Sequence, residues 1–192
     1  MVVKLTPMKG NSMAHTRNDG HTPRLQVPIQ PNIGLESDAR QAIVEILNIT
    51  LADEVVLQTQ SRCAMWNIRG ADFYQLHALL KDHCQLIDRL SDDIGGRVRM
   101  LGGFTIGSLE DYLQHTRLEE QPGLVPDILR LLANHEALIR FLRVDIRKCT
   151  EEYEDEGSYG LLVQVICQHE KMAWMLRSCI EVETNESENL KS

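Results

Sequence analysis

Hydrophobic residues recur at intervals of three and four along most of the chain, and this spacing predicts amphipathic helices. A first helix is expected from Ser37 to about Asn67, and a second begins after a cap at Asp72. The apolar stripe of this second helix consists of Phe73, Leu76, Leu80, Ile87, Leu90, Ile94 and Val98. Gly95 and Gly96 are expected to loosen or terminate its last turn, because each costs about 1 kcal/mol relative to alanine.

Two further long helices are expected after an extended crossover. The segment from Gly102 to Gly123 is long for a bundle loop and holds a short helix from Ser108 to about Thr116. A third long helix begins after Pro126, and its stripe consists of Ile128, Leu131, Leu132, His135, Leu138, Ile139, Leu142 and Ile146. A fourth follows an acidic turn, with a stripe of Leu161, Val165, Ile166, Met172 and Leu176. This order predicts an all-α four-helix bundle with one long crossover between helices two and three.

Composition divides the chain into one domain and two polar ends. Residues 1–33 hold four of the six prolines and lack apolar periodicity, which predicts a flexible basic arm before a bundle at 34–182. Residues 183–192 are expected to form a polar, frayed tail. No apolar run approaches membrane length and no signal-peptide pattern opens the chain, so we expect a cytoplasmic protein. Five cysteines without C-x-x-C spacing predict reduced thiols that serve as small core residues.

Polar residues also share one stripe of the second helix. His77, Asp92 and position 96 are separated by 15 and 4 residues, which is close to whole helical turns. A carboxylate in line with a histidine can form half of a divalent metal site. On periodicity alone, a hydrogen-bonded histidine at an interface is the favoured interpretation of His77.

Several stretches of the chain resemble the Dps family, the DNA-binding proteins from starved cells, which are mini-ferritins. Within residues 35–182 these stretches are MWNIRGADFYQLH, SDDIGGRVRMLGG, SLEDYLQHT, LLANHEALIRFLR and HEKMAWMLR. The resemblance implies a ferritin-like bundle that forms a dodecameric shell, oxidises iron(II) with peroxide or oxygen and stores the product against oxidative stress. It also implies that His77 and Asp92 act as catalytic metal ligands at a two-fold interface, where one subunit supplies histidines and its neighbour carboxylates.

Two of the four ligands that this resemblance implies are replaced. Met65 stands where most members have histidine, and Gly96 stands where they have glutamate. A thioether is too soft for iron oxidation, and a methionine that ends an apolar stripe favours packing over metal binding. We therefore expect an altered site that binds iron, zinc or another divalent cation and oxidises iron slowly. The alternatives are a shell without ferroxidase activity that binds DNA or buffers metal, and a helical interaction protein.

Further residues near this stripe have two interpretations each. Asp88 lies one turn before the stripe's aspartate and could replace the missing carboxylate, although a solvated carboxylate is favoured. His83 points about 240° away from His77, so one chain cannot chelate a metal with both. It is interpreted as a surface histidine or as a ligand contributed across a symmetric interface. Trp66 and Trp174 are expected in the core or at an interface, and Trp66 could quench oxidising equivalents.

The acidic turn between the third and fourth helices has a structural and a functional interpretation. It is either a solvated loop or, as the resemblance implies, part of a negatively charged three-fold pore that focuses cations inward. The residues concerned are Glu151, Glu152 and Glu154.

The amino-terminal arm is a candidate DNA-binding segment. It carries a net charge of +3 within a chain of net charge −8, and a dodecamer would present twelve such arms to DNA phosphates. Its cations are Lys4, Lys9, Arg17 and Arg24. Against DNA binding, these four charges are scattered and the rest of the chain is strongly acidic.

Overall fold

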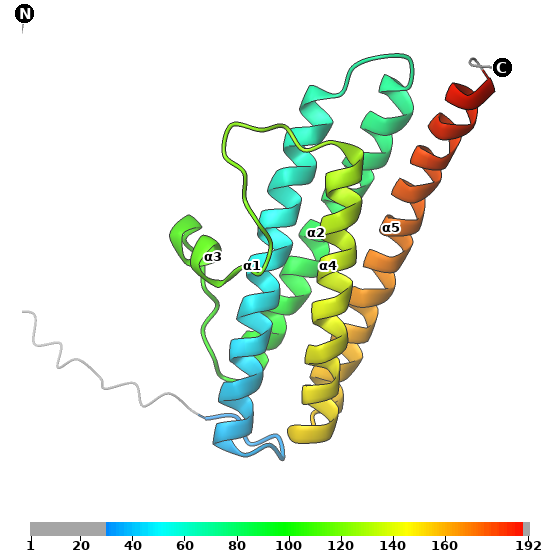
Figure 1. Ribbon diagram of the computed structural model, residues 1–192. Coiled ribbons are helices and arrows are strands. Elements are labelled where there is room, and N and C mark those ends of the chain that lie inside the picture. Colours follow the sequence, from blue (N-terminus) through cyan, green and yellow to red (C-terminus); the bar gives the residue numbers. More distant parts are fainter. Residues whose placement is uncertain (1–29, 190–192) are drawn as a thin grey trace, which may run out of the picture.

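The computed structural model describes residues 30–189, which form four long helices and two short helical segments (Figure 1). The elements are α1 (Ser37–Asn67), α2 (Phe73–Met100), α3 (Leu109–His115), α4 (Ile128–Arg147), a π-helical turn η1 (Lys148–Glu152) and α5 (Glu156–Asn189). The predicted all-α bundle, with its long crossover and short extra helix, is confirmed. None of the described helices combines the length and apolar character needed to cross a membrane.

The four long helices pack as two antiparallel pairs. Helix α1 lies along α2, and α4 lies along α5 (Figure 1). The crossover leaves the end of α2, passes outside α1 with α3 against it, and returns to the opposite end of the bundle, where α4 begins. The backbone of α5 continues to Asn189, into the polar segment that was expected as a tail.

The interior of the bundle is filled by the predicted apolar stripes. Its largest fully buried side chains are Ile43, Leu47, Leu57, Leu80, Ile87, Ile94, Leu131, Leu138, Leu142, Leu162, Met172 and Leu176. Each such side chain stabilises the fold by roughly 1.5–3 kcal/mol relative to exposure. All four long helices contribute to this list, so one continuous core holds the two pairs together.

One expectation for α2 is confirmed and one is wrong. The helix runs through Gly95 and Gly96 to Met100, as an apolar stripe that reaches Val98 predicts, because Ile94 and Val98 are fully buried on either side of the glycines. This packing outweighs the low helix propensity of glycine. Phe73, expected on the apolar stripe, is exposed at the first position of the helix.

The crossover is fastened to the bundle by a network of ion pairs. Arg117 in the crossover lies 2.7 Å from Oδ2 of Asp53 in α1 and 2.7 Å from Oδ2 of Asp145 in α4. Its guanidinium also lies over the Phe141 ring, 4.6 Å from the ring centroid. Burial raises the pKa of Asp53, although the charge and hydrogen bonds of Arg117 oppose the shift. The network therefore holds the crossover in place between α1 and α4.

The turn between α4 and α5 is tied to the end of α2. Arg97 Nη2 donates to Asp155 Oδ1 at 2.7 Å, and Arg97 Nε donates to Ser158 Oγ at 3.0 Å. A Cβ atom on Gly157 would lie 2.6 Å from Arg97 Nη2, so a larger residue here would displace the end of the Arg97 side chain. Burial opposes the charged form of Asp155, but hydrogen bonding by Ser158 and Arg97 lowers its pKa.

Candidate functional site

The residues predicted to bind metal between subunits lie along the outer face of α2. His77 is half-buried there, with its ring centroid 5.4 Å from that of Phe73, and Asp92 is exposed. Asp88 is also exposed and accepts a hydrogen bond from Gln58 Nε2 at 2.9 Å. His77 and Asp92 are about 22 Å apart along the helix axis, at 1.5 Å per residue. One chain therefore cannot bring both side chains to the same ion.

A shallow hollow of about 390 Å³ lies beside Asp92 and Gly96, between α2 and the crossover. Arg99 and Tyr112 are among the residues that line it. A Cβ atom at Gly96 would meet no other atom within 4 Å, so a larger side chain has room at this position. The missing fourth ligand is thus a feature of the sequence and is not imposed by the packing of the chain.

The end of α1 carries the other replaced ligand position. Met65 is half-buried and packs against the hydrophobic core, as the packing interpretation expected. The neighbouring Trp66 is 70% exposed, and Trp174 on α5 is 61% exposed. Neither tryptophan lies in the core of the chain, and a place for either at an interface stays a prediction.

His83 lies in the bundle interior and not on the surface as expected. It is 3% exposed, so both the surface and the interface interpretations of this residue are wrong. It stands three residues after Leu80 and four before Ile87, which places it on the apolar stripe itself. His83 does lie on a different face of α2 from His77, as their spacing predicts, but that face points into the core and not toward solvent.

His83 belongs to a cluster of four buried polar side chains, one from each long helix. This core cluster consists of Glu54 in α1, His83 in α2, His135 in α4 and His169 in α5. His169 Nε2 lies 2.8 Å from Glu54 Oε1, and His169 Nδ1 lies 2.9 Å from His135 Nδ1. The His83 ring meets the His135 ring edge-on, with centroids 5.9 Å apart. A polar layer therefore crosses the otherwise apolar interior.

Burial favours the neutral forms of two of these histidines. It lowers the pKa of His83 to about 4 and lowers that of His135 well below its usual value; the charge of His169 adds to both shifts. His169 Nε2 donates to the Glu54 carboxylate, and in the contact between His169 Nδ1 and His135 Nδ1 one nitrogen donates to the other.

Several side-chain nitrogen and oxygen atoms of the core cluster have no hydrogen-bond partner. They are Glu54 Oε2, His135 Nε2 and both ring nitrogens of His83. An unsatisfied buried polar atom destabilises a fold by roughly 1–3 kcal/mol, and native proteins hold few of them. The cluster is therefore a candidate site for a ligand that would satisfy these atoms.

The spacing of residues along each helix does not by itself predict this cluster. His135 falls on an apolar stripe with nothing to link it to His83, and Glu54 and His169 were not among the predicted site residues. The signal was nevertheless present, because Glu54 follows Leu51 by three residues and so occupies a core position of α1. A charged or imidazole side chain at such a position usually has a partner on another helix.

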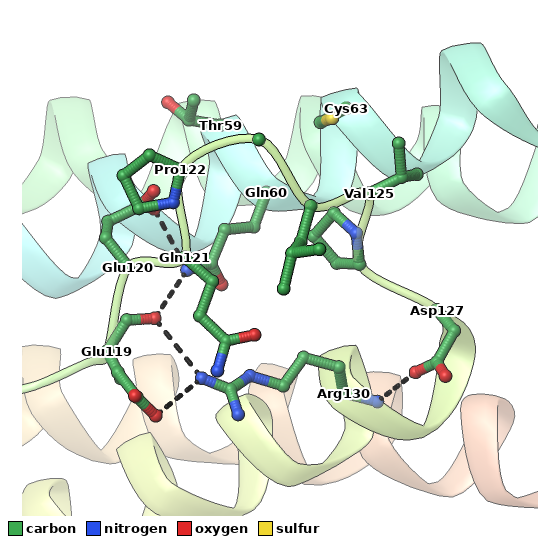
Figure 2. A pocket seen from close by; sticks show the side chains of 13 residues that line it. Thr59, Gln60, Cys63, Glu119, Glu120, Gln121, Pro122, Val125, Asp127 and Arg130 are labelled. Carbon is green, nitrogen blue, oxygen red and sulfur yellow. Dashed lines mark hydrogen bonds and ion pairs between the residues drawn. The ribbon is translucent and has the colours of Figure 1, made fainter.

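A hollow of about 510 Å³ between α1 and the end of the crossover offers less chemistry (Figure 2). Its polar groups bind one another: Gln60 Nε2 donates to Glu120 Oε1 at 3.0 Å, and Arg130 pairs with Glu119 at 2.8 Å. Asp127 accepts from the backbone N–H of Arg130 at 2.7 Å and caps α4. These contacts shape the loop, so the hollow is better explained as part of the fold than as a site.

The remaining predicted site residues are charged groups at the ends of the chain and of the bundle. The three glutamates expected at a pore are all exposed beside the turn between α4 and α5: Glu151, Glu152 and Glu154. Their place in a pore depends on neighbouring subunits and stays a prediction. The four cations expected to bind DNA lie outside the described residues: Lys4, Lys9, Arg17 and Arg24.

Comparisons with known sequences agree with the fold. A family profile described as a ferritin-like domain matches residues 44–184. The chain is 40% identical over 154 residues to a low temperature-induced protein of Nostoc, which covers 78% of this chain and 86% of that protein. It is 33% identical over 126 residues to the DNA protection during starvation protein of Agrobacterium fabrum, covering 64% of this chain and 76% of that protein.

Solved structures give the same assignment. DpsC from Streptomyces coelicolor superimposes with a TM-score of 0.74 at 32% identity, covering 79% of this chain and 90% of that one. The Dps protein of Vibrio cholerae, described as a ferritin-like diiron-carboxylate protein, superimposes with a TM-score of 0.72 at 25% identity. The superposition covers 79% of this chain and 96% of the Vibrio cholerae chain. The chain therefore belongs to the Dps family of ferritin-like proteins.

Proposed function

We propose that this protein is a mini-ferritin that binds iron(II) between subunits, oxidises it slowly with peroxide or oxygen, and stores it in a dodecameric shell. The observation that carries the proposal is the outer face of α2, where an imidazole and a carboxylate lie too far apart to act within one chain. His77 of one subunit and Asp92 of its neighbour would supply the two donors. Imidazole nitrogen and carboxylate oxygen are both suitable ligands for iron.

The sequence of this face is self-complementary for a two-fold contact between antiparallel copies of α2. In such a contact, each pairing of two residues occurs twice. If His77 faces Asp92, the axis passes between positions 84 and 85, and Lys81 then faces Asp88. A cation thus meets an anion on either side of the axis, and all four of these residues are exposed or half-buried in the single chain.

The same register also matches large side chains with small ones. Tyr74, which is 82% exposed, would face Gly95 of the neighbouring copy. A ring projecting toward a residue without a side chain allows two helices to approach closely. Size and charge therefore support the same register as the proposed metal ligands.

The proposed site has fewer ligands than a complete one, and this supports slow oxidation. Met65 packs into the core and Gly96 supplies no donor atom. Asp88 is engaged by Gln58 and would be engaged by Lys81 across the contact, which favours a structural role for it over metal binding. Iron held by His77 and Asp92 would keep open positions for water and oxidant.

The exposed glutamates beside the turn between α4 and α5 support a route for iron into the shell. Three carboxylates from each of three subunits would attract cations toward an entrance. The residues proposed to line this entrance are Glu151, Glu152 and Glu154.

DNA binding by the amino-terminal arm is a second candidate function, without any requirement for iron oxidation. It is supported by the net charge of +3 on residues 1–33 and by the loss of two metal ligands. Binding of this kind weakens steeply with salt, because it depends on the release of counterions from phosphates. An electrophoretic mobility assay at two salt concentrations, with the arm present or deleted, tests it.

Stopped-flow measurement of iron(II) oxidation tests the main proposal. We expect His77→Ala and Asp92→Ala each to lower the initial rate about tenfold or more, as loss of a ligand does at metal sites. His115→Ala, at an exposed histidine of α3, is the matched control and should keep the wild-type rate. Equal rates in all four proteins would place the oxidation elsewhere.

Restoring the missing ligands tests the same site by gain of function. The double variant Met65→His, Gly96→Glu should oxidise iron about tenfold faster than the wild type. The glutamate has room at position 96 of the isolated chain. A folded double variant with no increase in rate would show that the proposed site does not limit oxidation.

A further inference from the structure

We propose that the ligand of the core cluster is the proton, and that the cluster is an acid-sensitive switch within each subunit. Near neutral pH, it holds the α1–α2 pair against the α4–α5 pair. In mild acid, added protons open the interface between the two pairs on the side where α4 begins. The end of the bundle where α4 ends stays closed and acts as a hinge. The switch needs no second chain and does not depend on the proposed iron chemistry.

The first argument is the place of the cluster between the two pairs of helices. Glu54 and His83 belong to the α1–α2 pair. His135 and His169 belong to the α4–α5 pair. Two contacts cross from one pair to the other: His169 Nε2 lies 2.8 Å from Glu54 Oε1, and the ring of His83 meets a ring of α4 edge-on. A change of charge in the cluster therefore acts directly on the interface between the pairs.

The second argument is the number of protons that these contacts can hold. His169 Nδ1 lies 2.9 Å from His135 Nδ1, which fits a hydrogen bond with one proton between the two nitrogens. If both rings are imidazolium, each Nδ1 carries its own hydrogen, and two donors then face each other. A proton on His135 Nε2 also lacks an acceptor, because this buried atom has no hydrogen-bond partner. Added protons therefore replace attraction with repulsion inside the core.

The third argument is the balance of charge around the histidines. Three buried imidazoles share one buried carboxylate, that of Glu54 in α1. In α2, the charge of Asp82 acts on His83, but Asp82 is exposed and solvent screens it. From α2 and α5, the charges of His83 and His169 act on His135 with the same sign as its own. The buried carboxylate can offset one imidazolium, and a second is repelled by the first.

Burial sets the direction of the switch. It lowers the pKa of His83 to about 4 and lowers the pKa of His135 well below its usual value, and the charge of His169 adds to both shifts. In an open, hydrated interface the pKa of each ring returns toward about 6.5, so the open form binds more protons than the closed form between these values. The closed form is therefore favoured above pH 6.5 and loses this advantage as the pH falls toward 4.

The ion pairs that cross the same interface lie toward the other end of the bundle. Arg97, near the end of α2, pairs with Asp155 just before α5 at 2.7 Å. Arg117 in the crossover pairs with α1 and with Asp145, two residues before α4 ends. Toward the start of α4, the interface holds a hydrogen bond between neutral groups, which Asn134 Nδ2 donates to a glutamine of α1 at 2.5 Å. The charged ties are thus placed to act as the hinge.

Acid does not weaken these ion pairs in the range that charges the histidines. Burial opposes the charged form of Asp155, but hydrogen bonds from Ser158 and Arg97 lower its pKa, so its stabilising effect persists until the pH falls below about 4. Burial raises the pKa of Asp53 against the charge of Arg117, so this carboxyl favours the closed form in acid. The end of the bundle near Asp155 therefore stays closed while the cluster opens.

Hydrogen exchange of backbone amides, measured by mass spectrometry on the assembled full-length protein, tests the switch. Exchange is followed at pH 6 and at pH 5, and each rate is divided by the intrinsic rate of an unfolded amide at the same pH. Opening that takes up two protons becomes about a hundredfold more favourable over this interval, tenfold for each proton. We expect the corrected exchange rate of residues 128–140 to rise about a hundredfold, and that of residues 143–160 to rise less than about threefold.

Glutamine variants count the protons, because an amide keeps hydrogen-bonding atoms but does not titrate. His83→Gln and His135→Gln should each reduce the rise at residues 128–140 to about tenfold, and the double variant should nearly abolish it. His115→Gln, at an exposed histidine of α3, is the matched control and should keep the hundredfold rise. A rise that is unchanged in folded His83→Gln and His135→Gln overturns the proposal.

If the glutamine variants fail to fold, the wild type decides. A rise limited to the side of the cluster where α4 begins supports the switch and its hinge. An equal rise across residues 128–160 indicates acid unfolding of the whole subunit, and no rise indicates that the cluster does not respond to acid. Either of these two results overturns the proposal.

Discussion

His77 and His83 lie six residues apart on α2, yet their surroundings have little in common. His77 is half-buried on the outer face, beside exposed carboxylates of the same helix. His83 is buried inside, against a histidine of α4. Fewer than two turns of helix therefore separate a surface whose proposed role depends on assembly from a buried polar cluster formed within one chain.

The two regions should therefore respond to different perturbations. The core cluster is held by contacts between helices of the same chain, so changes there act on the stability of the subunit. The outer face of α2 has few partners within the chain, so changes there act on association and on iron chemistry. Variants of the two faces are natural controls for one another.

Removal of His169 is expected to have the largest effect on stability. His169→Ala leaves the Glu54 carboxylate buried without its partner, which typically destabilises a protein by about 3–5 kcal/mol. His77→Ala should change the free energy of unfolding by no more than about 0.5 kcal/mol. Urea denaturation at one matched protomer concentration, with EDTA present, measures both. Equal losses for the two variants would contradict the distinction between the faces.

Acid should act on the core cluster next most strongly. The pKa of His83 is about 4 in the folded chain and about 6.5 when unfolded, so the unfolded chain binds more protons between these values. The free energy of unfolding is therefore highest above pH 6.5 and falls as the pH drops toward 4. The loss from His83 alone is on the order of 3 kcal/mol.

Denaturation at pH 7 and at pH 4.5 checks this expectation. The difference between the two values should be smaller in His83→Leu than in the wild type. His115→Ala, which removes an exposed histidine, should keep the wild-type difference. A pH dependence that is unchanged by His83→Leu would mean that other groups cause the acid sensitivity.

Charge reversal on the outer face should have a smaller effect, confined to assembly. In the proposed two-fold contact, Lys81→Asp places like charges opposite each other twice per dimer. A penalty of about 1 kcal/mol for each pair raises the dissociation constant of the contact about 30-fold. Adding Asp88→Lys exchanges the two charges and should restore association. Sedimentation velocity measures the effect, and a double variant no better than the single one would rule out this register.

Much of the fold followed from the spacing of apolar residues. The bounds of α1 and the start of α2 were predicted closely, because long amphipathic stripes mark them, although the side chain of Asp72 makes no capping hydrogen bond. The stripe also carries α2 as far as Val98, but only the burial of Ile94 and Val98 shows that Gly95 and Gly96 stay helical. Local propensity carries no information about such tertiary packing.

The candidate sites were predicted unevenly. The stripe that joins His77 to Asp92 is a property of one helix and can be read from sequence spacing alone. The core cluster is a property of four helices, and nothing in the local sequence shows that His83 meets His135. A polar residue within an apolar stripe was interpreted as a surface group, whereas on this helix it marks a polar contact inside the core.

Diffraction at the iron edge from anaerobic crystals soaked in iron(II) tests the central claim most directly. We predict a dodecamer with iron bonded to His77 of one subunit and Asp92 of its two-fold neighbour. One such ion should lie on each side of every two-fold axis, near the Lys81–Asp88 pairs. An assembly in which His77 and Asp92 are far apart across every contact would contradict the account.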